Sequence, residues 1–412
     1  MRDIELYQHM MGLRPPWRVT DVRMDVKAQE IEVTATCDET AWGCPTCGQR
    51  AHIHGYERRR WRHLDSCQFK TYVSAEVPRV KCPEHGTVTV QVPWAEGSGR
   101  FTALFERLAI EVLLQCSISG ACELLQISWA EADGIKQRAV RRGLSRKCAT
   151  PIARLCVDEK SFGRGQDYVT LVVNADDPKA AKVEHISDGR SQESLDIFWR
   201  GRSPEQLSAV EAVAMDLWEA YRASTLAHVP GAGDKIVHDP FHLIGHMNDA
   251  VNDVRKAEQR VLKELGDDRL SGTRQIWLYG FENVPEKWGS RLDDLRTQKL
   301  QTARAWALKE MLRDFFVCQN TAEATAFFTS WYQWAIRCRL KPVQRVARMF
   351  KRHLANILTF FRLRLTTAAS EGLNSRIAGI IKKACGYRNR ARFKADVYFH
   401  AGGLDLYPAF SQ

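Results

Sequence analysis

The chain has 412 residues, 44% of them hydrophobic, and a net charge of +11. This length allows about two to four domains, and this hydrophobic fraction supports sizeable cores, which excludes wholesale disorder. A run of about 18 uncharged apolar residues is absent from the sequence, so we expect no transmembrane helix. The N-terminal residues lack the apolar centre of a signal peptide, which favours a cytoplasmic protein. In that reducing compartment, the twelve cysteines are expected to be metal ligands and buried thiols.

The positive charge is concentrated in one C-terminal stretch. Residues 337–400 contain sixteen Lys and Arg but two acids, Glu371 and Asp396, which gives a net charge of +14. Subtracting this from the value for the whole chain leaves −3 for the remainder. A solvated helix face is the usual explanation of a charge run, but such a face normally mixes both signs. The single sign therefore favours a nucleic acid partner, which would place the protein on the nucleoid when bound.

The first 100 residues predict a β-rich module that binds zinc. Segments 30–36 and 71–77 alternate as strands do. Two residues separate Cys44 from Cys47, the same spacing separates Cys82 from His85, and a glycine follows each pair. Zinc prefers four sulfur or nitrogen ligands in a tetrahedron, and two such knuckles supply them with no obvious open position. We therefore expect one structural Zn²⁺.

Other residues of this module have weaker assignments. Cys37 is a competing zinc ligand, and Cys67 is a weaker competitor. Three consecutive arginines, Arg58, Arg59 and Arg60, lie between the two knuckles and are candidate contacts to DNA phosphates.

Residues 101–147 change to helical spacing and predict a helix-turn-helix domain. Residues 118–125 can form one helix, and Ser128 can cap a second helix that starts at Trp129. The second helix carries four candidate DNA contacts, Lys136, Arg138, Arg141 and Arg142. A basic second helix fits recognition in a major groove. Any helical hairpin shows this spacing, so the interpretation depends on the neighbouring zinc module. A linker is expected at 145–151.

The remainder predicts an α/β domain that is interrupted by helices, which makes the whole chain a multidomain α/β protein. Residues 152–242 show the order β-β-β-α-β-α-β, a three-strand meander followed by parallel crossovers. Few enzyme folds begin this way, and the RNase H-like fold is one of them. Residues 243–365 are almost wholly helical and predict an inserted helical domain. Residues 366–412 are then expected to complete the catalytic core with a Glu-bearing helix and a basic DNA clamp.

Three acids are candidates for a catalytic magnesium site. Asp158 ends the first predicted strand and Asp216 ends the fourth, and these two strands are neighbours in the proposed fold. Glu371 lies in a basic segment. Carboxylates that converge from separate elements can hold two Mg²⁺ ions for phosphoryl transfer. Each acid also has an ordinary explanation, namely a solvated strand end, a helix N-cap and a partner for Arg376.

Asp239 competes with Asp216 for the second position because it also ends a predicted strand. The residues alone do not separate the two aspartates fully. By its place in the chain, Asp239 belongs to the fifth strand, farther from the first. His242 follows three residues later, so the pair could hydrogen-bond and brace the core. We interpret Asp239 and His242 as auxiliary residues.

These motifs resemble the ISL-three family of bacterial insertion-sequence transposases, a family of DDE type. The resemblance covers nearly the whole chain and rests on the first knuckle with Cys82 and on segments 61–65, 157–163, 215–221, 237–243, 371–377 and 386–389. It implies a catalytic triad at Asp158, Asp216 and Glu371, and an RNase H-like core with a helical insertion. One departure is His85, where such proteins often have a cysteine; histidine is an equally good zinc ligand.

The expected function is that of a DNA transposase. It would bind the terminal inverted repeats of an insertion sequence and catalyse strand cleavage and strand transfer with two Mg²⁺ ions. Asn374 and Arg376 would orient Glu371 or touch DNA. The proposed clamp of the phosphates near the cut consists of Lys382, Lys383, Arg388, Arg390 and Arg392. Because two DNA ends must be joined, we expect a homodimer or a higher oligomer. The alternatives are a DNA-binding repressor without catalysis and a nuclease that cuts without rejoining.

Overall fold

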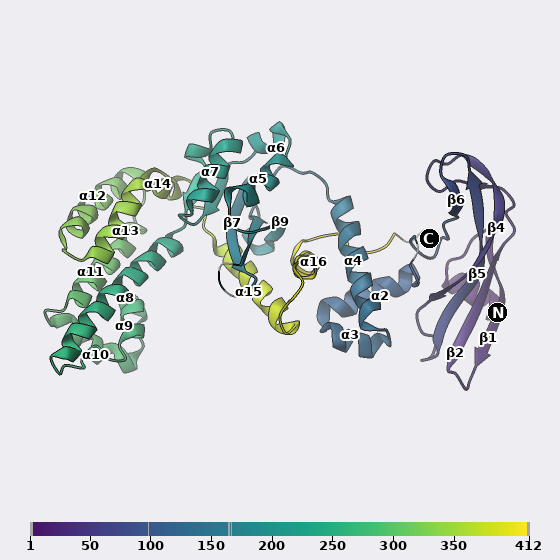
Figure 1. The fold of residues 1–412 in the computed structure, drawn as a ribbon, viewed down its shortest axis with the longest axis horizontal. Coiled ribbons are helices and arrows are strands. Elements are labelled where there is room, and N and C mark those ends of the chain that lie inside the picture. Colours follow the sequence, from purple (N-terminus) through teal and green to yellow (C-terminus); the bar gives the residue numbers. More distant parts are fainter. Residues whose placement is uncertain (1–2, 98, 164, 166, 410–412) are drawn as a thin grey trace. The chain divides into compact units, whose positions relative to one another are not determined.

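The computed structural model describes residues 3–97, 99–163, 165 and 167–409 (Figure 1). The chain divides into two compact units. The first unit combines residues 1–148 with 382–412, and the second contains residues 149–381. This division differs from the expectation that all of 366–412 completes the catalytic core, because the residues from 382 onward pack with the N-terminal domains.

The first unit begins with helix α1 (Asp3–Met10) and a six-stranded sheet. Its strands are β1 (Trp17–Asp25), β2 (Glu30–Cys37), β3 (Trp42–Gly43), β4 (Arg50–Arg62), β5 (Lys70–Cys82) and β6 (Gly86–Thr89). The order is β1-β2-β5-β4-β3, and β6 also pairs with β5. Burial alternates along β2, as expected for a strand with one face on a core. Trp94 packs edge-on against Trp17 and Trp61, at ring-centroid distances of 4.9 and 5.3 Å.

The predicted helix-turn-helix follows the sheet. It consists of α2 (Ala103–Gln115), α3 (Ile118–Leu125) and α4 (Trp129–Arg146). Ser128 caps α4 as predicted, and the Glu131 carboxylate accepts a hydrogen bond from the backbone N–H of Ser128, which completes a capping box. The last helix of the chain, α16 (Arg390–Ala401), packs against α4, and its Phe399 joins the core of these helices.

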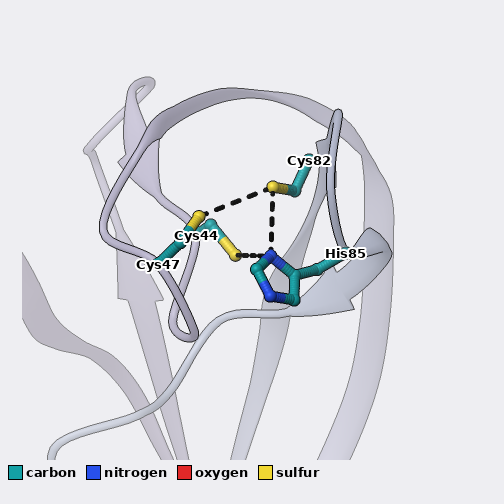
Figure 2. A group of neighbouring side chains, drawn as sticks. All are labelled: Cys44, Cys47, Cys82 and His85. Carbon is teal, nitrogen blue, oxygen red and sulfur yellow. Dashed lines mark hydrogen bonds between the residues drawn. The ribbon is translucent and has the colours of Figure 1, made fainter.

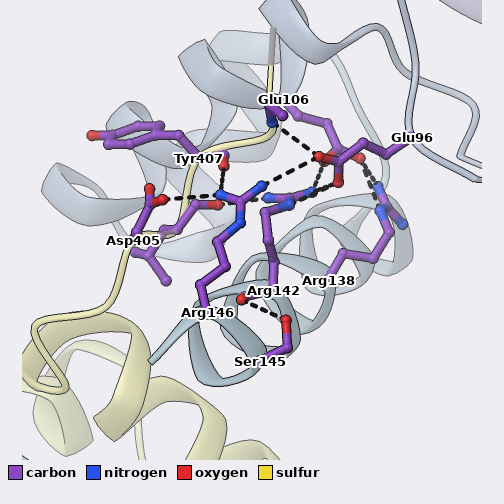
Figure 3. A network of polar contacts seen from close by, with 10 residues as sticks. Glu96, Glu106, Arg138, Arg142, Ser145, Arg146, Asp405 and Tyr407 are labelled. Atoms are coloured by element: carbon purple, nitrogen blue, oxygen red, sulfur yellow. Dashed lines mark hydrogen bonds and ion pairs between the residues drawn. The ribbon is translucent and has the colours of Figure 1, made fainter. Parts of the chain in front are cut away.

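A buried network of charges ties the C-terminal residues to this domain (Figure 3). Glu106 on α2 pairs with Arg138 and Arg142 on α4, and Arg142 also pairs with Glu96. The Arg142 guanidinium donates to the carbonyl oxygen of Leu406, at 2.6 Å. Together with the packing of α16 on α4, these contacts join residues 390–409 to the first unit.

The second unit contains the predicted α/β core. Its elements are β7 (Arg154–Ser161), β8 (Tyr168–Asn174), β9 (Lys182–Asp188), α5 (Gln192–Arg200), α6 (Pro204–Ser208), β10 (Ala212–Met215), α7 (Glu219–His228) and β11 (Ile236–His238). The sheet order is β11-β10-β7-β8-β9, with β10 parallel to both β7 and β11. This order confirms the RNase H-like core and the prediction that the first and fourth strands are parallel neighbours. The core packs Trp199 of α5 and Tyr221 of α7 against the sheet.

A group of helices separates β11 from the last part of this core, as predicted. They are α8 (Pro240–Glu264), α9 (Arg274–Leu278), α10 (Glu286–Thr297), α11 (Gln301–Phe315), α12 (Thr321–Arg337), α13 (Lys341–Arg352) and α14 (Leu354–Leu363). Helix α14 returns to contact β11, and α15 (Ala368–Lys383) follows. Short 3₁₀ helices occur at 178–180, 232–234 and 281–283. Among the described residues, we find no helix that is long and apolar enough to cross a membrane.

Candidate functional site

The first candidate acid, Asp158, lies in β7 just beyond the part of that strand that pairs with β10. Its carboxylate accepts a hydrogen bond from the backbone N–H of Glu159 at 2.8 Å and another from the Asn374 amide at 2.6 Å. The second bond attaches α15 to the central strand of the sheet. Glu371 is three residues before Asn374 on α15, so the two share one face of that helix.

Burial raises the pKa of Asp158, and the nearby negative charge of Asp216 raises it further, against the opposing effects of its hydrogen bonds and His242. Burial likewise raises the pKa of Glu371, with Asp239 and Asp158 adding to the shift. In addition to burial, the charge of a neighbouring acid therefore contributes to both shifts. A bound cation would oppose these shifts, because a nearby positive charge favours the ionised form of a carboxyl group.

Asp216 follows β10 directly, and its pKa is shifted in the opposite direction from those of Asp158 and Glu371. Burial alone would raise its pKa, but the nearby His246 and His242 and the hydrogen bond from the backbone N–H of Leu217 outweigh burial, so the pKa lies below its usual value. The Nε2 atom of His246 is 3.6 Å from the Asp216 carboxylate. Asp216 therefore differs from Asp158 and Glu371 in the direction of its pKa shift.

Asp239, the competitor of Asp216, is buried at the start of α8 with 2% of its surface exposed. One oxygen accepts from the backbone N–H of Phe241 at 2.6 Å. The other accepts from both the backbone N–H and the hydroxyl of Thr367, the latter at 2.8 Å. Asp239 thus fastens the start of α8 to the residue that precedes α15. Within the described part of the chain, these bonds replace the expected hydrogen bond between Asp239 and His242.

Three further residues of this site were not singled out from the sequence. His246 lies four residues after His242, so both point from one face of α8; that spacing was the available signal. Glu159 neighbours Asp158, and burial together with Asp158 and Asp216 raises its pKa. Arg190 lies 3.8 Å from Glu159. The sequence carries no local signal for Arg190, because its proximity depends on how β9 and β7 meet β8 in the sheet.

The zinc ligands predicted from the sequence come together in the first unit (Figure 2). The donor atoms of Cys44, Cys47, Cys82 and His85 all lie within 4.8 Å of one another. The Cys47–Cys82 sulfur distance is 3.7 Å, and the His85 Nδ1 atom lies 3.6 Å from Cys82 and 3.9 Å from Cys44. A tetrahedron with zinc–sulfur bonds of about 2.3 Å has edges of about 3.8 Å, so this cluster fits zinc.

Backbone N–H groups of the first knuckle stabilise the thiolate form of Cys44. The N–H groups of Cys47 and Thr46 lower the pKa of Cys44 to about 6, which favours the thiolate that zinc binds. At Cys47 the N–H of Gln49 acts in the same direction, but desolvation and the neighbouring cysteines outweigh it and raise the pKa. Cys37, the competing ligand, lies outside the cluster. Cys3His is a common structural zinc set, in agreement with the predicted role.

The structure corrects part of the predicted DNA contacts on α4. Lys136 is buried and pairs with Asp396 of α16, and Arg142 is buried in the network of Figure 3. Both side chains hold the helices together, so they are not available to DNA. Arg138 pairs with Glu106, whereas Arg141 is exposed.

The other predicted DNA contacts are mostly exposed. Arg58 is exposed on β4; Arg59 donates to the carbonyls of Gly97 and Gly99, and Arg60 pairs with Glu30 and Glu32. All three arginines line one groove with Arg100. The C-terminal members Arg376, Lys382, Lys383, Arg388 and Arg392 are exposed, and Arg390 is half-buried. Lys383 donates to the carbonyl of Gln115, and Arg392 lies over the ring of Trp129.

Comparison with known families bears on these sites. Residues 155–397 match the profile of the DDE family ISL3, which is described as a transposase, and this match spans more than half of the chain. The chain belongs to the ISL3 (ISL-three) transposase family. Two further matches cover the N-terminal part of the transposase. Residues 40–85 match the zinc-finger of transposase IS204/IS1001/IS1096/IS1165, and residues 90–140 match the helix-turn-helix domain of transposase family ISL3.

Sequence similarity to individual relatives extends along most of the chain. The transposase is 25% identical over 423 aligned residues to the transposase for insertion sequence element IS1557 of Mycobacterium tuberculosis, covering 94% of this chain and 93% of the relative. It is 26% identical over 360 residues to the transposase for insertion sequence element IS1001 of Bordetella parapertussis, covering 85% and 86%. The predicted family, the structural zinc ribbon and the DNA-binding helix-turn-helix are thereby confirmed, and the family implies an activity that cuts and transfers DNA.

Proposed function

We propose that this transposase binds the terminal inverted repeats of an insertion sequence and catalyses DNA cleavage and strand transfer, with Asp158, Asp216 and Glu371 as ligands of two Mg²⁺ ions. The observation that carries the proposal is the hydrogen bond from Asn374 to Asp158, which brings the helix of Glu371 against the strand next to Asp216. In addition to burial, Asp216 raises the pKa of Asp158 and Asp158 raises that of Glu371, which supports grouping these three acids.

The residues present fit hard cations. Carboxylate oxygens are the ligands that Mg²⁺ prefers. Burial and the charges of neighbouring carboxylates raise the pKa of Asp158 and Glu371, and positive charge at the site would relieve both effects. Two bound Mg²⁺ ions would supply Lewis-acid stabilisation of the attacking and leaving oxygens of an in-line displacement.

The surrounding side chains would position these acids. Asn374 fixes one oxygen of Asp158, and His246 approaches Asp216 from α8. Asp239 connects the start of α8 to Thr367, four residues before Glu371, so it would set the position of α15. We therefore assign Asp239 an auxiliary role, together with His242.

DNA recognition is assigned to the first unit. The zinc ribbon and the helix-turn-helix would read the repeats, with phosphate contacts from exposed basic residues such as Arg58, Arg141 and Arg388. Because each insertion sequence has two ends to be joined, the active species would be at least a dimer.

The test is a cleavage and strand-transfer assay on labelled duplexes that carry the flanking repeats. Wild-type protein should cut and join with Mg²⁺, and Asp216→Asn should bind the repeats without cutting. Asp239→Asn should retain cutting in proportion to its folded fraction. Cutting by Asp216→Asn would transfer the metal-binding role to Asp239. Binding without any cutting by the wild type would favour a repressor, and cutting without joining would favour a nuclease.

A further inference from the structure

A groove of about 550 Å³ begins at the residue after Asp216. Its two walls come from the start of α7 and from the end of α13 in the helical insertion. The lining residues are Leu217, Trp218, Glu219, Ala220 and Arg222 on one side and Met349, Arg352 and His353 on the other. All of them belong to the second unit.

We propose that this groove holds one unstacked nucleotide of the DNA end, with its base on Trp218 and its phosphate at Arg352. The inference rests on the proposed function, since that function brings a DNA end to Asp216. It adds a binding site for a single extruded nucleotide next to the carboxylates.

The indole of Trp218 is exposed yet rigidly held. Its exposed fraction is 39%, and its ring N–H donates to the carbonyl of Arg190 at 2.8 Å. The guanidinium of Arg190 lies 4.6 Å from the centre of the indole and 4.3 Å from the ring of Tyr168. These contacts fix the indole, with Arg190 over the ring, and still leave 39% of Trp218 exposed. A fixed and accessible aromatic ring is the platform on which proteins stack single bases.

The charge of the groove suits a phosphate. Arg222 is paired with Glu219 at 3.0 Å, so these two lining charges compensate each other. Arg352 is exposed, and it has no hydrogen-bond or ion-pair partner in the described part of the chain. It therefore leaves the lining with a net positive charge. Helix α7 also begins at this wall without a side-chain cap, which adds the partial positive charge of a helix N-terminus.

An unsatisfied polar atom lies on the opposite wall. His353 has 7% of its surface exposed, and its Nδ1 atom has no hydrogen-bond partner among the described residues. Buried ring nitrogens normally have such partners. A base on Trp218 would bring donors and acceptors into the groove beside this histidine. Trp218 alone could stack against any flat ligand. A nucleotide is favoured because the exposed Arg352 would bind its phosphate and because the proposed function brings a DNA end to Asp216, beside the groove.

The experiment compares two probes that differ in their bases alone. Both are repeat duplexes with a two-nucleotide single-stranded overhang at the cut position, one with thymidines and one with abasic sites. Affinities are measured by fluorescence anisotropy without divalent cations. Wild-type protein should prefer the thymidine probe by about 5- to 150-fold, which corresponds to stacking of one base at about 1–3 kcal/mol.

Variants locate the site. Trp218→Ala should lose the preference, and Trp218→Phe should retain most of it. The matched control is Trp334→Ala, because Trp334 is 44% exposed on α12 and does not line the groove. Arg352→Gln should weaken binding of both probes equally and reduce the salt dependence by about one phosphate contact.

Equal affinity of the wild type for both probes, or failure to bind either, would overturn the inference. An unchanged preference in Trp218→Ala would overturn it as well. Asp158→Asn separates this outcome from failure of the proposed function, because it should keep the preference while cutting nothing. A wild type that prefers thymidines but never cuts would contradict the proposed chemistry and leave the groove assignment intact.

Discussion

Removal of the Glu106 carboxylate should destabilise the first unit severely. Glu106 and Arg142 have side-chain exposures of 5% and 7%, and they are 3.0 Å apart. Glu106→Ala would leave Arg142 buried without this carboxylate and would also remove the partner of Arg138. Breaking a buried ion pair from one side costs about 3–5 kcal/mol. We expect a loss near the lower end of this range, because Glu96 still compensates part of the Arg142 charge.

Hydrogen exchange of backbone amides in α2 and α4 measures this loss within the intact chain. Arg141→Ala is the matched control, since this exposed neighbour on α4 should change stability by less than about 0.5 kcal/mol. Replacing both charges at once, with Glu106→Leu and Arg142→Met, should recover much of the loss, because the charges that lose a partner, Glu96 and Arg138, are partly exposed. A cost below about 1 kcal/mol for Glu106→Ala would refute the structural role of the network.

Three further predictions concern metals, hydrogen bonds and pH. Cys82→Ser should lower the zinc content from one ion per chain, measured by atomic absorption, and expose the knuckles to proteolysis; full retention of zinc would contradict the ligand set. Asp239→Asn should destabilise the second unit by about 1–3 kcal/mol in hydrogen exchange of α8. The reason is that both carboxylate oxygens of Asp239 accept hydrogen bonds, from Phe241 and from Thr367, whereas an amide has one acceptor oxygen. Asp249→Asn, an exposed change on the same helix, should have little effect. Asp158→Asn should stabilise the metal-free protein at neutral pH. Burial raises the pKa of Asp158 in the folded protein, so its carboxyl group contributes stability while it is protonated at low pH and loses that contribution as the pH rises through the folded-state pKa. The gain from Asp158→Asn should therefore vanish when the pH falls below the ordinary pKa of an aspartate. A gain that persists in acid would contradict the raised pKa.

Local sequence patterns predicted much of this fold, because helix caps, ligand spacings and strand order are determined by residues that are close in the chain. Ser128 with Glu131 marked the start of α4, and the spacing of Cys44, Cys47, Cys82 and His85 marked the zinc cluster. The order of strands and helices over 152–242 was sufficient to place β7 beside β10. Each of these features depends on neighbours in the chain or on a simple topological rule.

Contacts between distant residues could not be predicted in this way. Lys136 and Arg142 carry the same charge as true DNA contacts, and their burial depends on Asp396 and Leu406, more than 250 residues away. Asp216 and Asp239 both follow a strand, and their difference arises from Thr367 and His246 in space. A basic or acidic residue acquires its role from tertiary partners that its own segment does not show.

The most direct test of the metal-binding assignment counts bound cations. Mn²⁺ in place of Mg²⁺ can be followed by electron paramagnetic resonance in the protein bound to a pre-cleaved repeat duplex that lacks the attacking 3′-hydroxyl. The assignment of Asp158, Asp216 and Glu371 predicts two ions in the wild type, as the two-metal mechanism requires. It predicts loss of bound Mn²⁺ in Asp216→Asn and full occupancy in folded Asp239→Asn. Full occupancy in Asp216→Asn together with loss in Asp239→Asn would contradict it.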